Sequence, residues 1–380
     1  MQQTDTAIKT IGIVGGGQLG RMLTEAAIPM GFKVIVVDPG ANCPAAQVGA
    51  EQIVAPLHDE AALGQLAADA DVITIEIEHV DTKLLSEINE FGKPVHPAPA
   101  TIAMIQDKYL QKHFLHNAGI PVADFVEITD GSSAQQALKD FGGKMLLKTR
   151  FGAYDGRGNM FVESEEDLEN GLKFFTGQPL YAEKFVPFTK ELAVMVARST
   201  TGETAVYPVV ETIQERNICL EVLAPAPVEK DVKKQAEKLA LDVVSQLEGA
   251  GVYGIEMFLT EDGRVLANEI APRVHNSGHF TIEGCETSQF EQHIRAITSM
   301  PLGSTKLVAP AAVMVNILGD RDGPTEIDGL GEAQSNGAAI HLYGKSPTKV
   351  DRKMGHITVT GDDLQKVRKA AEAARKAITV

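Results

Sequence analysis

The chain has 380 residues, of which 44% are hydrophobic, and can therefore bury a sizeable core divided between about two or three domains. Its formal net charge of −16 argues against a nucleic-acid partner, because binding to a phosphate backbone requires a basic face. The longest apolar segment, 308–318, is too short to span a bilayer, so we expect no membrane contact.

Two further features bear on the compartment. Residues 1–10 lack the apolar stretch of a signal peptide. Cys43, Cys219 and Cys285 are far apart in the sequence and lack the spacing of metal ligands. Reduced thiols in a cytoplasmic protein are the simplest interpretation.

A dinucleotide-fold pattern opens the chain. A predicted strand at 10–14 leads into G-G-G-Q-L-G at 15–20, followed by a predicted helix at 21–30 and a predicted strand at 33–37 that ends at Asp38. This order indicates a doubly wound domain whose helix N-terminus can hold a phosphate, as in nicotinamide oxidoreductases. However, a proline directly follows the acid, and the same glycines also serve tight strand-to-helix turns. The motif therefore indicates the fold more strongly than the cofactor.

Strands and helices continue to alternate, which predicts a parallel sheet. Glu76, Glu78 and His79 lie at the carboxyl end of a predicted strand, where open α/β sheets bind ligands, although a helix N-cap region has a similar composition. Several prolines then end this unit, and we place a domain boundary near residue 106. The predicted strands are 52–55 and 71–78, and the predicted helices are 59–70 and 101–117.

A glycine-rich loop, 148–159, follows the apolar run 145–147. Glycines let backbone N–H groups approach phosphate oxygens, and the lysine and arginines of the loop supply charge. We expect an anion-binding lid that is mobile without a nucleotide, and a solvated surface loop is the alternative. The flanking segments predict a small α+β domain, with helices at 132–141 and 165–174 and strands at 144–149, 159–163 and 180–186.

Longer strands after residue 190 predict an antiparallel sheet. Strands at 191–198 and 205–210 are joined through Thr201-Gly202-Glu203, which is typical of a hairpin. A second hairpin joins 253–259 to 265–270 through Asp262-Gly263, and this dipeptide favours a two-residue turn.

That turn would place Glu256 opposite Glu269. Because opposed like charges destabilise a sheet, we expect a divalent cation with oxygen ligands between them. A solvated pair on an exposed face is the alternative, and a bulge would change the register. Carboxylates combined with a lysine-bearing loop indicate Mg²⁺ with a nucleotide polyphosphate. The chain contains neither a P-loop motif nor the protein-kinase signatures, so another ATP-binding fold is required.

These motifs resemble the ATP-grasp superfamily and, within it, the ATP-dependent N5-carboxyaminoimidazole ribonucleotide synthetases of purine biosynthesis. The resemblance covers nearly the whole chain. It implies a Rossmann-like domain of the biotin carboxylase N-terminal type at 1–106, an ATP-grasp lid at 107–186, and a C-terminal domain at 187–380. The matching segments are 15–22, 153–158, 268–273, 275–279, 341–345 and 352–356.

The resemblance also assigns roles to residues. Mg²⁺ ligands are Glu256 and Glu269, and the catalytic residues are Tyr154, Asp155, Arg157 and Arg273. The ATP site comprises Lys108, Lys148, Ala153, Tyr154, Asp155, Gly156, Arg157, Gly158, Asn159, Glu183, Lys184, Phe185, Val186, Glu191, Gln214, Asn268 and Glu269. The imidazole ribonucleotide site comprises Gln18, Glu78, His275, Lys345, Arg352 and Lys353, and Gln214 departs from a family pattern that has histidine.

The implied activity is a carbon–nitrogen ligation of 5-aminoimidazole ribonucleotide with bicarbonate and ATP, through carboxyphosphate, by a homodimer. Three alternatives remain at this point. They are an ATP-grasp carboxylase or formyltransferase acting on glycinamide ribonucleotide, a nicotinamide oxidoreductase, and a nucleotide-binding regulator without turnover.

Overall fold

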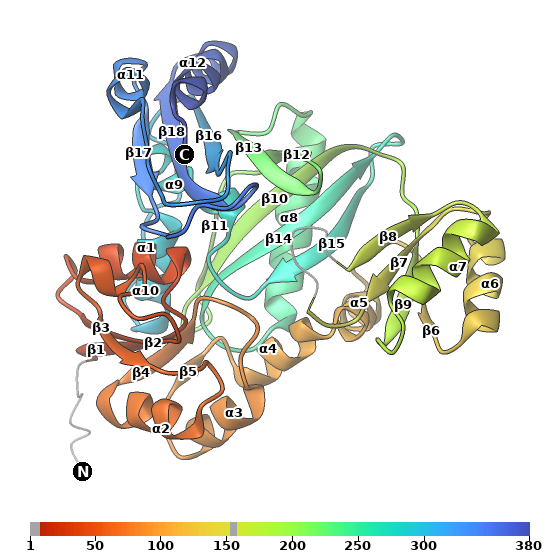
Figure 1. Ribbon diagram of the computed structural model, residues 1–380, viewed down its shortest axis with the longest axis horizontal. Helices are drawn as coiled ribbons and strands as arrows, with labels where there is room; N and C mark the ends of the chain where they lie inside the picture. The colour runs from red at the N-terminus through yellow and green to blue at the C-terminus, as the bar shows by residue number, and fades with distance from the viewer. Residues whose placement is uncertain (1–7, 153–157) are drawn as a thin grey trace.

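The computed structural model describes residues 8–152 and 158–380 (Figure 1). Within these residues the strands form three sheets, of five, four and nine strands. The predicted fold class is confirmed, with a parallel N-terminal sheet, a small antiparallel sheet and a large antiparallel C-terminal sheet. The domain limits 1–106, 107–186 and 187–380 stay a prediction. Among the described helices, none combines the length and the apolar character needed to cross a bilayer.

The N-terminal sheet has the strand order β3-β2-β1-β4-β5. Side chains alternate between its faces, so Ile11 and Ile13 pack beneath α1 while Ile35 and Val37 pack beneath α2 and α3. The strands are β1 (Thr10–Val14), β2 (Lys33–Asp38), β3 (Glu51–Val54), β4 (Val72–Ile75) and β5 (Val95–His96). The helices are α1 (Gln18–Ala27), α2 (Glu60–Asp69) and α3 (Thr82–Glu90), with a 3₁₀ turn η1 (Ala46–Val48).

The helix expected at 101–117 is two helices, α4 (Pro99–Gln106) and α5 (Lys108–Asn117). The chain breaks at Asp107, whose backbone is extended and whose carboxylate accepts hydrogen bonds from the N–H groups of Tyr109 at 3.0 Å and Leu110 at 3.2 Å. Aspartate at an N-cap satisfies N–H groups that have no helical partner, and this local gain outweighs the continuous helical pattern. Lys108 therefore lies in the first turn of a new helix.

The small sheet has the order β6-β9-β7-β8 and projects at one end of the molecule (Figure 1). Two helices cover one face, where Ala134, Leu138 and Leu168 pack against Leu147 and Val162. The strands are β6 (Phe125–Ile128), β7 (Met145–Thr149), β8 (Asn159–Val162) and β9 (Leu180–Lys184), and the helices are α6 (Gly131–Asp140) and α7 (Glu165–Phe174).

The large sheet has the order β15-β14-β10-β12-β13-β16-β18-β17, and β11 pairs with β10. One face of its first half packs on α8 and the other on α10, while α12 covers β16 and β18. The strands are β10 (Phe188–Arg198), β11 (Thr204–Val206), β12 (Val210–Glu215), β13 (Ile218–Ala224), β14 (Gly251–Thr260), β15 (Val265–Ala271), β16 (Ala311–Leu318), β17 (Ala339–Leu342) and β18 (Lys353–Gly361). The helices are α8 (Lys230–Gln246), α9 (Thr281–Gly284), α10 (Gln289–Ile297), α11 (Leu330–Ser335) and α12 (Leu364–Ala377), with η2 (Asn276–Gly278).

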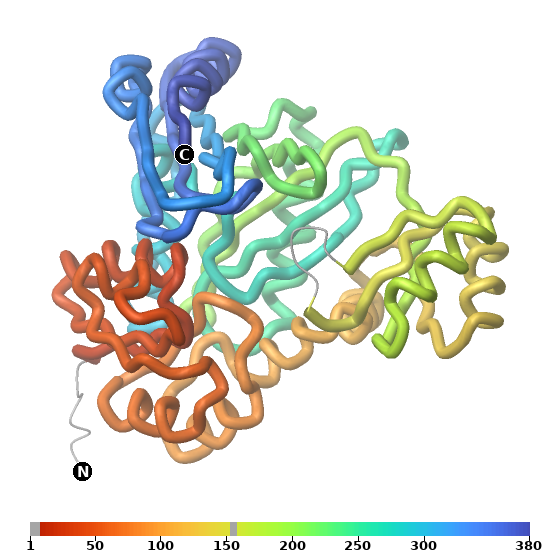
Figure 2. Tube along the Cα trace, in the orientation of Figure 1, coloured from red at the N-terminus to blue at the C-terminus, as the bar shows by residue number. Residues whose placement is uncertain are grey.

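The N-terminal unit also contacts the C-terminal segment, which lies beside it in the trace (Figure 2). The side-chain amide of Gln47 donates to the carbonyl of Gly344 at 3.0 Å. Thr74 on β4 contacts His293 on α10 at 2.8 Å, which ties the same unit to the large sheet. These contacts hold the two sheets together beside a shared cavity.

Candidate active site

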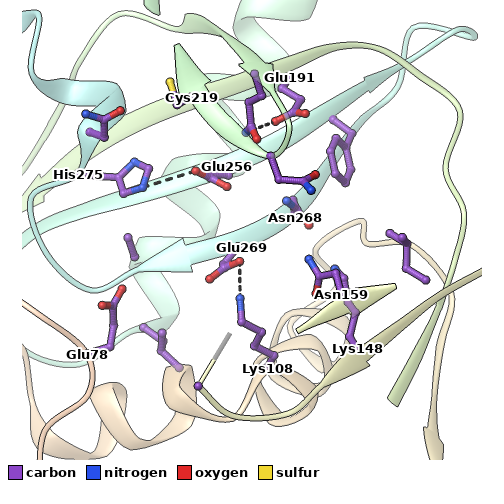
Figure 3. A pocket seen from close by; sticks show the side chains of 18 of the residues that line it. Glu78, Lys108, Lys148, Asn159, Glu191, Cys219, Glu256, Asn268, Glu269 and His275 are labelled. Carbon is purple, nitrogen blue, oxygen red and sulfur yellow. Dashed lines mark hydrogen bonds and ion pairs between the residues drawn. The ribbon is translucent and has the colours of Figure 1, made fainter. Parts of the chain in front are cut away.

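A cavity of about 660 Å³ is lined by residues of the N-terminal unit, the small sheet and the large sheet (Figure 3). Its size is typical of small-molecule sites. Glu78 comes from the N-terminal unit, Lys148 and Asn159 from the small sheet, and Glu191 and Glu256 from the large sheet. Of the predicted site residues, the cavity is lined by Glu78, Lys108, Lys148, Asn159, Phe185, Glu191, Gln214, Glu256, Asn268, Glu269, Arg273, His275 and Lys353.

The predicted pairing of Glu256 with Glu269 is confirmed, but the predicted two-residue turn is wrong. The strands end at Thr260 and restart at Val265, so the turn is longer. A bulge at Asn268 then restores the register, because Met257 pairs with Ala267 and Glu256 with Glu269. A bulge re-aims side chains, and here Asn268 and Glu269 both line the cavity.

Burial disfavours the charge of both carboxylates, but neighbouring groups shift their pKa values in opposite directions. Burial, with further contributions from Glu269 and Glu191, raises the pKa of Glu256 to about 7. For Glu269, burial acts in the same direction, but the nearby Lys108 outweighs it and lowers its pKa. The Nζ of Lys108 donates to Glu269 at 2.7 Å. A cation is therefore already directed at one member of the pair.

Arg273 and Lys353 add two further cationic groups to the cavity lining. Arg273 forms a forked pair with Glu78, with Nε to Oε2 at 3.0 Å and Nη2 to Oε1 at 2.7 Å. Lys353, at the start of β18, also lines the cavity. Forked guanidinium groups bind carboxylate and phosphate in fixed orientations.

His275 lies beside the carboxylate pair, with Nε2 at 3.5 Å from Glu256 Oε1. Burial, assisted by Arg273 and Lys353, lowers the pKa of His275 to about 3, so the ring is neutral and this contact is not an ion pair. Its Nδ1 lies 2.9 Å from the hydroxyl of Ser277. His275 is thus a fixed neutral group at the edge of the carboxylate pair.

Aromatic side chains form an apolar wall of the cavity, of which the sequence predicted only Phe185 as a site residue. Phe161 and Phe185 contact each other edge to face at 5.1 Å, and Phe188 stacks on Phe258 at 4.6 Å. All four line the cavity. Phe161, Phe185 and Phe188 are 41%, 36% and 41% exposed, so these rings present apolar surface to the cavity. Such a wall suits a planar heterocycle.

Glu191 and Gln214, on the neighbouring strands β10 and β12, both line the cavity. The amide of Gln214 donates to Glu191 Oε2, and burial raises the pKa of Glu191 to about 7. The glutamine thus supplies a donor to Glu191 at the position where the resemblance implies a histidine.

Other predicted site residues do not line the cavity. Glu183 is buried on β9 between Lys112 and Lys148. Lys184 pairs with Asp124. Of the three predicted C-terminal cations, Lys353 lines the cavity but Lys345 and Arg352 do not. Lys345 donates to the carbonyl of Lys353 at 3.0 Å, and Arg352 donates to the carbonyl of Pro347 at 2.7 Å. The remaining predicted residues that do not line the cavity are Gln18, Gly158 and Val186. Ala153, Tyr154, Asp155, Gly156 and Arg157 lie outside the described residues.

The glycine motif at 15–20 is occupied by the protein itself. The carboxylate of Glu76 accepts hydrogen bonds from the N–H groups of Gly17 at 2.8 Å, Leu19 at 3.1 Å and Gly20 at 3.0 Å. Gly15, with φ of 102°, is required because a Cβ there would lie 2.4 Å from Glu76 Cγ. The N–H groups that hold a pyrophosphate in dinucleotide-binding domains thus hold a side chain, which argues against the nicotinamide alternative.

Among the described residues, no cluster of three or more histidine, cysteine, aspartate or glutamate side chains could hold a metal ion. The opposed glutamates contribute two carboxylates to the cavity lining instead. That number suits Mg²⁺, which binds through one or two carboxylates and completes its shell with phosphates and water.

The fold and the cavity together define an ATP-grasp ligase. Family models match three consecutive parts of the chain: a ribonucleotide synthetase preATP-grasp domain at 8–106, an ATP-grasp domain at 113–290, and a phosphoribosylaminoimidazole carboxylase C-terminal domain at 312–370. The chain is 40% identical over 368 residues to the N5-carboxyaminoimidazole ribonucleotide synthase of Synechococcus elongatus, covering 96% of this chain and 93% of that protein. The chain belongs to the N5-carboxyaminoimidazole ribonucleotide synthase family.

Solved structures are similar over the same length. The N5-carboxyaminoimidazole ribonucleotide synthetase of Thermotoga maritima is 46% identical with a TM-score of 0.90, covering 98% of this chain and 99% of that chain. The Aspergillus clavatus synthase, in complex with ADP and 5-aminoimidazole ribonucleotide, is 39% identical with a TM-score of 0.90 and 98% coverage of both chains. The chain spans about two thirds of the length of several fungal and plant phosphoribosylaminoimidazole carboxylases, 67% in Ogataea methanolica.

Proposed function

We propose that this chain joins bicarbonate to the exocyclic amine of 5-aminoimidazole ribonucleotide at the expense of ATP, giving N5-carboxyaminoimidazole ribonucleotide, ADP and phosphate in purine biosynthesis. One observation carries the proposal, namely the convergence of an opposed carboxylate pair, lysines and a second cationic group in one cavity. The Aspergillus clavatus complex with ADP and 5-aminoimidazole ribonucleotide supports the same pair of ligands.

ATP would lie between the small and the large sheet. The aromatic wall formed by Phe161, Phe185, Phe188 and Phe258 suits the adenine ring, and the buried Glu191 suits the ribose hydroxyls. Lys108 and Lys148 would neutralise the polyphosphate. The loop residues Ala153, Tyr154, Asp155, Gly156, Arg157, Gly158 and Asn159 would cover the phosphates.

Glu256 and Glu269 fit Mg²⁺, because they are oxygen donors whose mutual repulsion a dication relieves. Asn268 adds an amide oxygen beside them. When bound, the ion would neutralise charge on the transferring phosphoryl group.

The imidazole ribonucleotide would lie toward the N-terminal sheet. Arg273 and Lys353 would bind its phosphate, with Lys345 and Arg352 near Lys353, and Glu78, Gln18 and His275 would orient the remainder. These cations explain how a chain of net charge −16 can bind a phosphorylated substrate.

The reaction balances in two steps. A bicarbonate oxygen bonds to the γ-phosphorus of ATP while the bond to ADP breaks, which gives carboxyphosphate. The amine then bonds to the carboxyl carbon, phosphate leaves with its electron pair, and the amine loses a proton. Asp155 is the proposed acceptor or hydrogen-bond partner of that proton. Full carboxylation by Asp155→Asn, alongside loss of ATP turnover in Glu269→Gln, would show that Asp155 does not have this role.

The test is ADP release measured with each amine, with and without bicarbonate. The proposal expects release only with 5-aminoimidazole ribonucleotide and bicarbonate together. Release with glycinamide ribonucleotide would favour the related carboxylase or formyltransferase, and ATP binding without release would indicate a regulator. A change in NAD(P)H absorbance would favour a nicotinamide oxidoreductase.

A homodimer and a cytoplasmic location complete the proposal. The three cysteines form no disulfide, which is compatible with a reducing compartment. Light scattering on the purified chain would test the dimer.

A further inference from the structure

Lys112 is a buried lysine to which neither the sequence motifs nor the cavity gives a role. It lies one helical turn after Lys108 on α5, and only 3% of its surface is exposed. Its Nζ is 2.5 Å from Oε1 of Glu183 on β9. Isolated buried ammonium groups are strongly disfavoured, so a lysine here requires this carboxylate.

The same carboxylate also contacts Lys148. Lys148 Nζ pairs with the second oxygen of Glu183, so one buried glutamate bridges two lysines that come from different elements. Burial alone would raise the pKa of Glu183, but Lys112 and Lys148 outweigh it and lower its pKa to about 2. Glu183 is therefore ionised.

Of these three residues, Lys148 lines the cavity, as labelled in Figure 3, whereas Lys112 and Glu183 do not line it. Lys112 and Glu183 lie behind it, so any effect of Lys112 on a ligand must pass through Glu183. Two lysines and one glutamate carry one net positive charge. Without Lys112, Lys148 and Glu183 would form a neutral pair, and the ammonium would be held by the carboxylate.

We propose that Lys112 is a positioning residue for the ATP site, because it binds one oxygen of Glu183 and so leaves the Lys148 ammonium with net charge for a polyphosphate. This inference rests on the proposed function, since it takes the ligand at Lys148 to be ATP. The surroundings favour it, because Glu78, Glu191, Glu256 and Glu269 also line the cavity and repel phosphates.

The first test is the Kd for ATP of Lys112→Met, measured by calorimetry. We expect Kd to rise about tenfold, while the KM for 5-aminoimidazole ribonucleotide stays within about twofold, a split that general loss of structure would not give. The matched control is Lys238→Met, which removes a lysine paired with Asp242 on the exposed face of α8 and should leave Kd unchanged.

The double variant Lys112→Met/Glu183→Gln restores one net positive charge at Lys148 and keeps the test valid if the single variant fails to fold. We expect its Kd for ATP to lie within about threefold of wild type. A folded Lys112→Met with wild-type Kd, or a folded double variant weakened more than about threefold, would overturn the inference. Failure of wild type itself to bind ATP would instead overturn the proposed function.

Discussion

Glu256 and Glu269 lie opposite each other on β14 and β15 because Asn268 forms a bulge between them and the turn. The bulge also lets two consecutive residues, Asn268 and Glu269, line one cavity, which a regular strand would not allow. The carboxylate pair is thus a product of local strand irregularity together with turn length.

Replacing either glutamate by glutamine should remove an oxygen donor without changing the side-chain shape. We expect Glu256→Gln and Glu269→Gln to lower kcat for ADP release by at least about 10²-fold, because the charge that forms during phosphoryl transfer loses its counter-charge. Glu261→Gln, in the exposed turn of the same hairpin, is the control and should keep wild-type kcat. Equal activity in all three variants would contradict the assignment.

Arg273→Lys keeps the positive charge but loses the forked contact with Glu78. We expect the KM for 5-aminoimidazole ribonucleotide to rise about tenfold or more, with a smaller change in the KM for ATP. The reason is that a lysine cannot hold both oxygens of the Glu78 carboxylate at once. Steady-state kinetics with each substrate varied in turn measures the two effects. Arg295→Lys, which alters a surface pair with Glu291, should change neither KM.

Gln214 supplies a hydrogen bond to the buried Glu191. Gln214→His keeps a donor, so we expect the KM for ATP to stay within about threefold of wild type. Gln214→Leu leaves the carboxylate without that donor, and the KM should rise about tenfold, the equivalent of one charge-assisted hydrogen bond. If histidine and leucine have the same effect, the contact is not used.

His293 gives a prediction about pH and stability. Its Nδ1 accepts from the N–H of Val252 at 3.1 Å, and burial, with a contribution from His96, lowers its pKa to about 3. The unfolded chain takes up this proton near the ordinary pKa of about 6.5, so the contribution to stability is complete above that pH and is lost as the pH falls toward 3.

As the pH falls below about 6, this group should lower the free energy of unfolding of the wild type by up to about 1.4 kcal/mol per pH unit. The variant His293→Asn should not show this loss. Urea unfolding midpoints at pH 7.5 and 5.0 measure the difference, with the exposed His116→Asn as the control. Parallel loss in wild type and in His293→Asn would show that the ring is not the group concerned.

Local patterns predicted much of this molecule. Alternating apolar residues and glycine turns gave the three sheets, and the boundaries of β1 and α7 agree with those expected. The pairing of Glu256 with Glu269 was predicted for a partly wrong reason, since a longer turn and a bulge offset each other. Neither the longer turn nor the bulge can be predicted from the alternation of apolar and polar residues, because both depend on contacts across the sheet.

Other features depend on contacts between distant segments. Glu76 fills the glycine turn from 56 to 59 residues away, and Glu183 joins Lys148 at a separation of 35. A pattern of apolar and polar residues contains no signal for such pairs. Phe161, Phe185 and Phe258 lie in predicted strands beside the glycine-rich loop and the glutamate pair, and were a usable signal for the aromatic wall. Lys112 gave no signal, because a lysine in an amphipathic helix is ordinarily a solvated residue.

In the proposed reaction, ATP activates bicarbonate before it reaches the amine. Bicarbonate labelled with ¹⁸O, incubated with ATP and 5-aminoimidazole ribonucleotide, tests it most directly when the released phosphate is analysed by mass spectrometry. We expect one ¹⁸O in each phosphate, because the oxygen that attacks the γ-phosphorus leaves with it. Unlabelled phosphate released together with a carboxylated product would rule out activation of bicarbonate by ATP.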